Sequence, residues 1–109
     1  MSQPDDRNQD VLDEIVRRIV RVAAPERIVC FGSAARGEAR PSSDVDLLVI
    51  MPGRCHRGWL TEEIYLSLIG VGRAVDVIVV TPEDVERYRD TPFLVIAPAL
   101  RDGRVISAA

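Results

Sequence analysis

Two aspartates open an otherwise apolar run near the middle of the chain. Asp44 and Asp46 flank Val45, and the run continues through Ile50 without another charged residue. Successive side chains of a strand point to opposite faces, so these two carboxylates would share one face, with Cα atoms roughly 6.5 Å apart. Carboxylates at that spacing can hold one or two hard cations, and Mg²⁺ combines such ligands with substrate phosphates. The pair therefore predicts a metal-binding edge on a strand spanning residues 44–50.

A turn suited to binding phosphate precedes this strand. Gly32 and Ser33 follow the apolar run 28–31, which predicts a short buried strand, and residues 34–37 predict a brief helical turn closed by glycine. Glycine lets the backbone approach a phosphate closely, while backbone N–H groups and the Ser33 hydroxyl can donate to its oxygens. The turn therefore complements the two aspartates.

A third carboxylate, Asp76, lies inside the apolar run 73–80. This run predicts a strand, and its almost unbroken apolar pattern is typical of a central, buried one. A carboxylate in that setting is costly unless a cation or a charged partner satisfies it. The alternative is an aspartate at the start of the strand, whose side chain reaches solvent or Arg73.

Gly32-Ser33, ten intervening residues and Asp44-x-Asp46 resemble the signature of the DNA polymerase beta-like nucleotidyltransferases. The longer string GSAARGEARPSSDVDLLV resembles the minimal nucleotidyltransferase family in particular. The resemblance implies that AMP is moved from ATP to a hydroxyl, with Asp44, Asp46 and Asp76 as the catalytic residues that hold two Mg²⁺ ions. It also implies that Gly32 and Ser33 bind the β- and γ-phosphates.

The resemblance covers residues 28–50 densely and residues 10–106 more loosely. Within the dense part, Arg36 is a further candidate for nucleotide binding. Its guanidinium would neutralise phosphate charge, or it would pin the loop to Glu38 or Asp44, and the sequence leaves both readings open.

Minimal nucleotidyltransferases are commonly paired with a HEPN-domain ribonuclease as a toxin–antitoxin system. The resemblance therefore implies an antitoxin that places AMP on a tyrosine near the ribonuclease site of its toxin. Two alternatives stay open: a non-catalytic module that neutralises its partner by covering it, and a transferase that modifies a small-molecule hydroxyl. The nucleobase, the acceptor and the choice between a hetero-oligomer and a homodimer are also open.

The periodicity of the chain predicts a flexible tail at residues 1–8 and one domain at 9–109. Amphipathic or capped segments predict helices at 9–24, at 59–71, and from Pro82 to Arg87 or Arg89. A less regular helix is expected at 93–100, followed by a turn and a short final strand or extended tail at 101–106. These elements indicate a single-domain α/β (α+β) fold. The resemblance implies the nucleotidyltransferase fold, with a mixed, mostly antiparallel sheet and helices packed on one side.

Several side chains receive structural interpretations. The outer side of the first helix carries an arginine row that is interpreted as a solvated face: Arg17, Arg18 and Arg21. His56 is interpreted as an exposed loop residue, with contact to a nucleobase or a partner as the alternative. Trp59 and Tyr65 are assigned to core or interface packing rather than to a base-stacking platform.

Composition limits the remaining classes of function. A chain of 109 residues supports one hydrophobic core. The net charge of −3 argues against stable binding of long nucleic acid, although all 14 basic residues are arginine, which suits phosphate recognition. Cys30 is expected to be a small buried hydrophobe. The polar N-terminus and the lack of a long apolar run predict a cytoplasmic protein without a membrane span.

Overall fold

The computed structural model describes residues 6–32, 44–53, 55–88 and 96–108. Its elements follow in the order α1 (Asp6–Ala23), β1 (Arg27–Phe31), β2 (Val45–Ile50), α2 (Arg57–Ser67), β3 (Val75–Val80), α3 (Pro82–Tyr88), α4 (Ile96–Asp102) and β4 (Arg104–Ala108). The predicted helical turn at 34–37 lies outside the described residues, as does the first part of the helix predicted at 93–100. None of the described helices combines the length and the apolar character needed to cross a membrane.

The four strands form one mixed sheet in the order β3-β2-β1-β4. β1 pairs antiparallel with both β2 and β4, whereas β2 and β3 run parallel. This confirms the expected mixed, mostly antiparallel sheet. The prediction that 73–80 forms a central strand is wrong, because β3 lies at an edge of the sheet.

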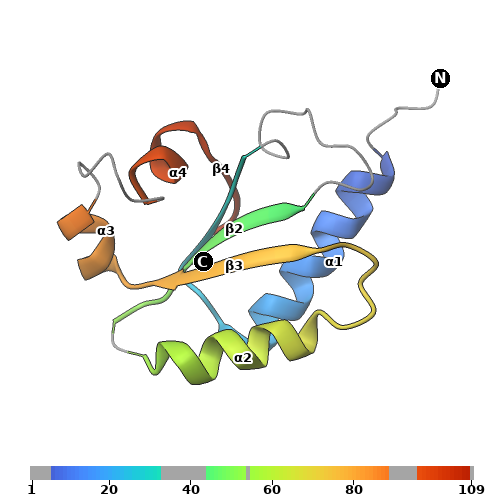
Figure 1. Cartoon of the computed structure of the whole chain (residues 1–109), viewed down its shortest axis with the longest axis horizontal. Coiled ribbons are helices and arrows are strands. Elements are labelled where there is room, and N and C mark those ends of the chain that lie inside the picture. Colours follow the sequence, from blue (N-terminus) through green and yellow to red (C-terminus); the bar gives the residue numbers. More distant parts are fainter. Residues whose placement is uncertain (1–5, 33–43, 54, 89–95, 109) are drawn as a thin grey trace.

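Helices cover both faces of the sheet (Figure 1). On one face, α1 and α2 pack on alternate residues of three strands, around Ile15, Ile19, Leu47 and Ile64, none of which has any exposed surface. On the other face, a smaller cluster joins β1, β2 and β3 to Ala99 of α4 and to Val85 and Tyr88 of α3. The expectation of helices on one side only is therefore wrong. This double cover also explains why β3 is apolar on both faces although it lies at an edge.

Most predicted boundaries hold within a few residues. α1 begins at Asp6, so three residues assigned to the tail are helical. α2 begins at Arg57 rather than Trp59, because the exposed His56 acts as its N-cap, with Nδ1 accepting a hydrogen bond from the Trp59 N–H at 3.0 Å. A helix begins at Pro82 as predicted, and the final strand is β4. Cys30 is a buried free thiol, as expected.

Arg18 contradicts its interpretation as part of a solvated face. Its Nε donates to Glu14 at 2.8 Å, and its Nη1 donates to the carbonyls of Ser67 and Ile69 at 3.1 and 3.0 Å. Ser67 is the last residue of α2, where a helix leaves its last carbonyls without intrahelical partners, and Ile69 lies in the turn that follows. Arg18 therefore ties α1 to the end of α2, a long-range contact that helical periodicity cannot reveal.

We expect Arg18→Met to lower the free energy of unfolding by about 1–2 kcal/mol, since it removes charge-assisted bonds to carbonyls and keeps the aliphatic stem. That loss corresponds to a fall in melting temperature of roughly 4–8 °C per kcal/mol in a domain of this size. Arg17→Met is the matched control, because Arg17 pairs with Glu14 of its own helix and its side chain is 61% exposed. Equal melting temperatures for the two variants would contradict the role of Arg18.

Candidate functional site

The two sequence-predicted strands place Asp46 and Asp76 side by side. The parallel register of β2 and β3 pairs Asp46 with Asp76, and the antiparallel register of β1 and β2 pairs Phe31 with Asp46. Paired residues on neighbouring strands share a face, and neighbouring strands lie roughly 4.8 Å apart. Asp44 immediately precedes β2 and is exposed. We call these three aspartates the carboxylate row.

The negative charges of the carboxylate row lie close together and repel one another. Partial burial raises the pKa of Asp46, and the neighbouring carboxylates of Asp76 and Asp44 raise it further. Each of these effects disfavours the ionised form of Asp46. A cation at the row would favour that ionised form instead, so the electrostatics of the row suit a cation.

Gly32 borders the row from the end of β1. Its φ of +74° is a conformation that non-glycine residues rarely adopt, and an added Cβ would lie 2.6 Å from Oδ2 of Asp46. The positive φ and the lack of room for a Cβ therefore each select glycine at position 32. The backbone at Gly32 thus passes directly against a carboxylate of the row. Ser33 and Arg36 lie outside the described residues.

The donor atoms of the row fit a magnesium ion in their chemistry. Carboxylate oxygens are hard ligands, and Mg²⁺ usually takes one or two of them together with water and substrate phosphates. Within residues 6–32, 44–53, 55–88 and 96–108, no group of three or more His, Cys, Asp or Glu side chains is arranged to hold one ion. The row therefore offers a partial ligand set, which phosphate oxygens would have to complete.

Asp76 is exposed, so the prediction of a buried carboxylate is wrong. It is the second residue of an edge strand, and Val75 and Val77 point to the opposite, covered face. The alternative, an aspartate near the start of the strand that reaches solvent, describes its exposure correctly. The pairing of Asp76 with Asp46 across the sheet does not depend on burial.

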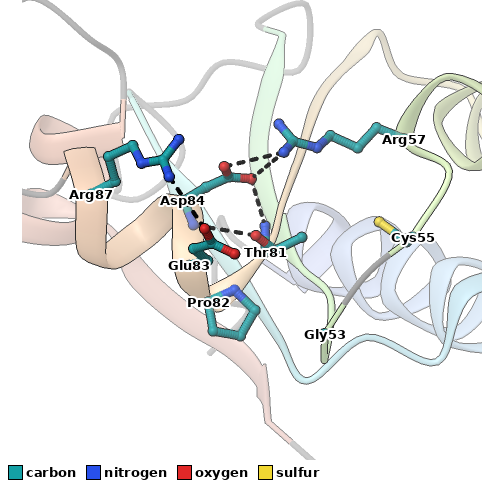
Figure 2. Close-up of a pocket in the computed structure, with 8 residues that line it drawn as sticks. All are labelled: Gly53, Cys55, Arg57, Thr81, Pro82, Glu83, Asp84 and Arg87. Carbon is teal, nitrogen blue, oxygen red and sulfur yellow. Dashed lines mark hydrogen bonds and ion pairs between the residues drawn. The ribbon is translucent and has the colours of Figure 1, made fainter.

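A cleft of about 380 Å³ lies at the opposite ends of β2 and β3 (Figure 2). It is lined by Gly53, Cys55, Arg57, Thr81, Pro82, Glu83, Asp84 and Arg87. Thr81 lies five positions beyond Asp76, or roughly 16 Å along an extended strand. The cleft is therefore distinct from the carboxylate row.

Charges along this cleft pair with each other. Asp84 bonds Arg57 at 3.0–3.1 Å and accepts the Thr81 N–H at 3.0 Å, while its own N–H donates to Thr81 Oγ1. Burial alone would raise the pKa of Asp84, but the bonds from Thr81 and Arg57 outweigh it and lower that pKa. Thr81 and Asp84 thus cap the start of α3, and the bonds of Asp84 to Arg57 join it to the start of α2. The sequence predicts Thr81 as the cap of α3, whereas no sequence signal indicated Arg57.

Comparisons with known proteins identify the family of the chain and support its fold. A family model described as a nucleotidyltransferase domain matches residues 10–103. The fold also matches the crystal structure of a candidate nucleotidyltransferase from Sulfolobus solfataricus, with a TM-score of 0.59 and 20% sequence identity, over 96% of this chain and 89% of that chain. None of the curated proteins matches the sequence.

We expect Asp46→Asn to raise the melting temperature at neutral pH without divalent cations, by no more than about 4 °C because solvent screens the row. The raised pKa means that Asp46 favours folding only while it is protonated, near and below the ordinary carboxyl value of 3.8. This contribution is lost as the pH rises above that value. The advantage of Asp46→Asn should therefore shrink as the pH falls towards 3.8. A variant that is less stable at neutral pH would contradict the repulsion in the row.

We expect Gly32→Ala to destabilise the fold more than Gly53→Ala. Both glycines have a φ of +74°, so both variants incur strain of about 1–2 kcal/mol. An added Cβ at Gly53 has no atom within 4 Å, whereas at Gly32 it meets Asp46, which adds about 1–3 kcal/mol. Denaturant unfolding measures the difference.

A double-mutant cycle isolates the contact of Gly32 with Asp46. The extra cost of Gly32→Ala should disappear in an Asp46→Ala background, because the carboxylate that the new Cβ would meet is gone. An undiminished cost in that background would show that Asp46 is not the obstructing group.

Proposed function

This chain belongs to the nucleotidyltransferase domain family, and we propose that it transfers AMP from ATP to a hydroxyl group. The observation that carries the proposal is the register that sets Asp76 beside Asp46, with Gly32 packed against Asp46. The sheet thereby brings together three segments that are far apart in the sequence. Each segment contributes a group that phosphoryl transfer needs.

The three aspartates of the carboxylate row have different proposed roles. Asp44 and Asp46 would bind Mg²⁺, Asp76 would add a ligand on the acceptor side, and phosphate oxygens would complete the ligand set. Mg²⁺ held there would neutralise charge on the triphosphate as the transfer proceeds. Gly32 and Ser33 would cradle the β- and γ-phosphates, with Ser33 assigned on the sequence alone.

We assign Asp76 as the group that takes the proton from the acceptor hydroxyl. The acceptor oxygen forms a bond to the α-phosphorus of ATP, and the bond from that phosphorus to the bridging oxygen breaks, so that pyrophosphate leaves. The carboxylate of Asp76 takes the proton of the attacking hydroxyl. Its exposure at the sheet edge supports this role, because an acceptor carried by another molecule can reach it.

The acceptor we propose is a tyrosine of a HEPN-domain ribonuclease, which would make this chain the antitoxin of a toxin–antitoxin pair. The support is the resemblance of residues 28–50 to the minimal nucleotidyltransferases. The open position of Asp76 is compatible with an acceptor of protein size. The following experiment distinguishes AMP transfer from neutralisation of the partner by binding alone.

We expect Asp76→Asn to abolish transfer while keeping nucleotide binding. A general base contributes typically about 10²–10⁴-fold to the rate, so initial rates should fall by at least that range. The readout is the intact mass of the partner after incubation with Mg²⁺ and ATP. The wild type should add one or more AMP units, and Asp76→Asn should add none.

Two controls separate chemistry from folding and binding. Glu26→Gln removes an exposed carboxylate near the opposite end of β1 and should transfer normally. Asp76→Asn should keep most of the stabilisation by Mg²⁺-ATP, which amounts to about 2.7 kcal/mol at a hundredfold excess over Kd. If the wild type silences the partner without adding mass, the chain acts by covering its partner, and the transfer proposal is wrong.

A further inference from the structure

The outer side of α2 carries several large apolar side chains. The inner side of this helix buries Leu60 and Ile64 against the sheet. The opposite side carries Trp59 and Leu66, continued by Ile69 in the turn after the helix, and these side chains are 57%, 55% and 72% exposed. We call Trp59, Tyr65, Leu66 and Ile69 the α2 stripe.

A helix at a protein surface normally turns polar residues outward. In the part of the chain that the structure describes, the α2 stripe instead holds four of the seven large hydrophobic side chains that are exposed, the others being Val20, Val22 and Val105. Scattered hydrophobic residues need no explanation, but a contiguous group marks an interaction surface. The α2 stripe is such a group, because its members lie within eleven consecutive residues, on the outer side of a helix and its terminal turn.

The α2 stripe is separate from the carboxylate row. α2 packs on the face of the sheet that carries Leu47 and Val77, whereas Asp46 and Asp76 belong to the opposite face. Figure 1 shows α2 along one border of the molecule, beside β3 and α1. An occupant of the stripe would therefore leave the row accessible.

We propose that the α2 stripe is a homodimer interface in which α2 packs antiparallel against α2 of a second copy. A two-fold interface requires a surface that is complementary to itself. The α2 stripe meets this condition, because large apolar side chains stand at both ends and the middle is occupied by Leu66. Antiparallel packing places Trp59 of one copy against Ile69 of the other.

The exposed area of the α2 stripe supplies most of what such a dimer needs. The four side chains leave roughly 450 Å² exposed in each copy, if a side chain of this kind presents about 150–250 Å² in full. A two-fold contact would remove about 900 Å² from water through these residues alone. Their neighbours need to add only a few hundred Å² to reach the roughly 1,200 Å² at which specific interfaces begin.

One charge opposes association. Glu62 is exposed and lies between Trp59 and Leu66 on the same side of α2. In the antiparallel arrangement the two Glu62 side chains are offset along the helices by about 6 Å, so each lies near the middle of the contact. Their desolvation weakens the dimer, so Glu62→Leu should tighten it by about tenfold, which is 1.4 kcal/mol.

Tyr65 of the α2 stripe has a defined contact within the protein. Its hydroxyl accepts the Val77 N–H at 2.8 Å, so the Tyr65 ring is fixed over the open edge of β3. A ring held in one position loses little conformational entropy when it is buried. Tyr65 therefore extends the α2 stripe towards β3 as a preformed part of the interface.

Trp59 provides an internal probe, because it is the only tryptophan in the chain. Sedimentation velocity over a wide range of concentration should show a wild-type species of twice the 12.1 kDa chain mass. The fluorescence of Trp59 should shift to the blue over the same range as the ring leaves water. Leu66→Glu should sediment as a monomer at every concentration and keep a red-shifted emission.

Val105→Glu is the matched control, because Val105 is 51% exposed but lies on β4 at the other edge of the sheet. It should dimerise as the wild type does, and circular dichroism should show that both variants are folded. A wild type that stays monomeric, or a Leu66→Glu variant that dimerises normally, would overturn the proposal. The inference does not rest on the proposed function, and AMP transfer can fail or succeed independently of it.

Discussion

The parallel pairing of β2 with β3 is the constraint on which the rest of this structure depends. It brings Asp46 and Asp76 together, although thirty positions separate them in the chain. Parallel strands require a crossover connection, and α2 supplies it between them. The burial of Leu47, Val49, Val77 and Val79 beneath α1 and α2 fixes the register. A slip of one residue would move every carboxylate to the wrong face.

Hydrophobic burial therefore holds in place an arrangement that electrostatics alone would disperse. The ionised carboxylates of the row repel one another, and partial burial increases the cost of charging Asp46. Fully buried residues such as Leu47 and Leu48 follow directly in β2 and keep the strand in position. The protein thus retains a charged edge at some cost to stability, which is common where side chains serve function rather than folding.

Local patterns were enough to predict the strands and the helix starting at Pro82, because these features depend on period and capping. Properties that depend on distant contacts were not predictable. The apolar run of β3 does not distinguish a central strand from an edge strand covered on both faces, so the burial of Asp76 was predicted wrongly. Arg18 resembles any exposed arginine until α2 is placed beside it. The role of Gly32 was predicted in part, since its spacing indicated a close backbone approach but not the contact with Asp46.

The bond from the Val77 N–H to the Tyr65 hydroxyl has a consequence for how the molecule behaves in water. An open sheet edge is a template on which other chains can add strands and start aggregation. A phenol from α2 occupies one of the outward N–H groups of β3, so a foreign strand cannot pair there without first displacing that ring. The Val77 amide should accordingly exchange its hydrogen slowly for a residue at a sheet edge, and its exchange rate reports how often α2 lifts away from β3.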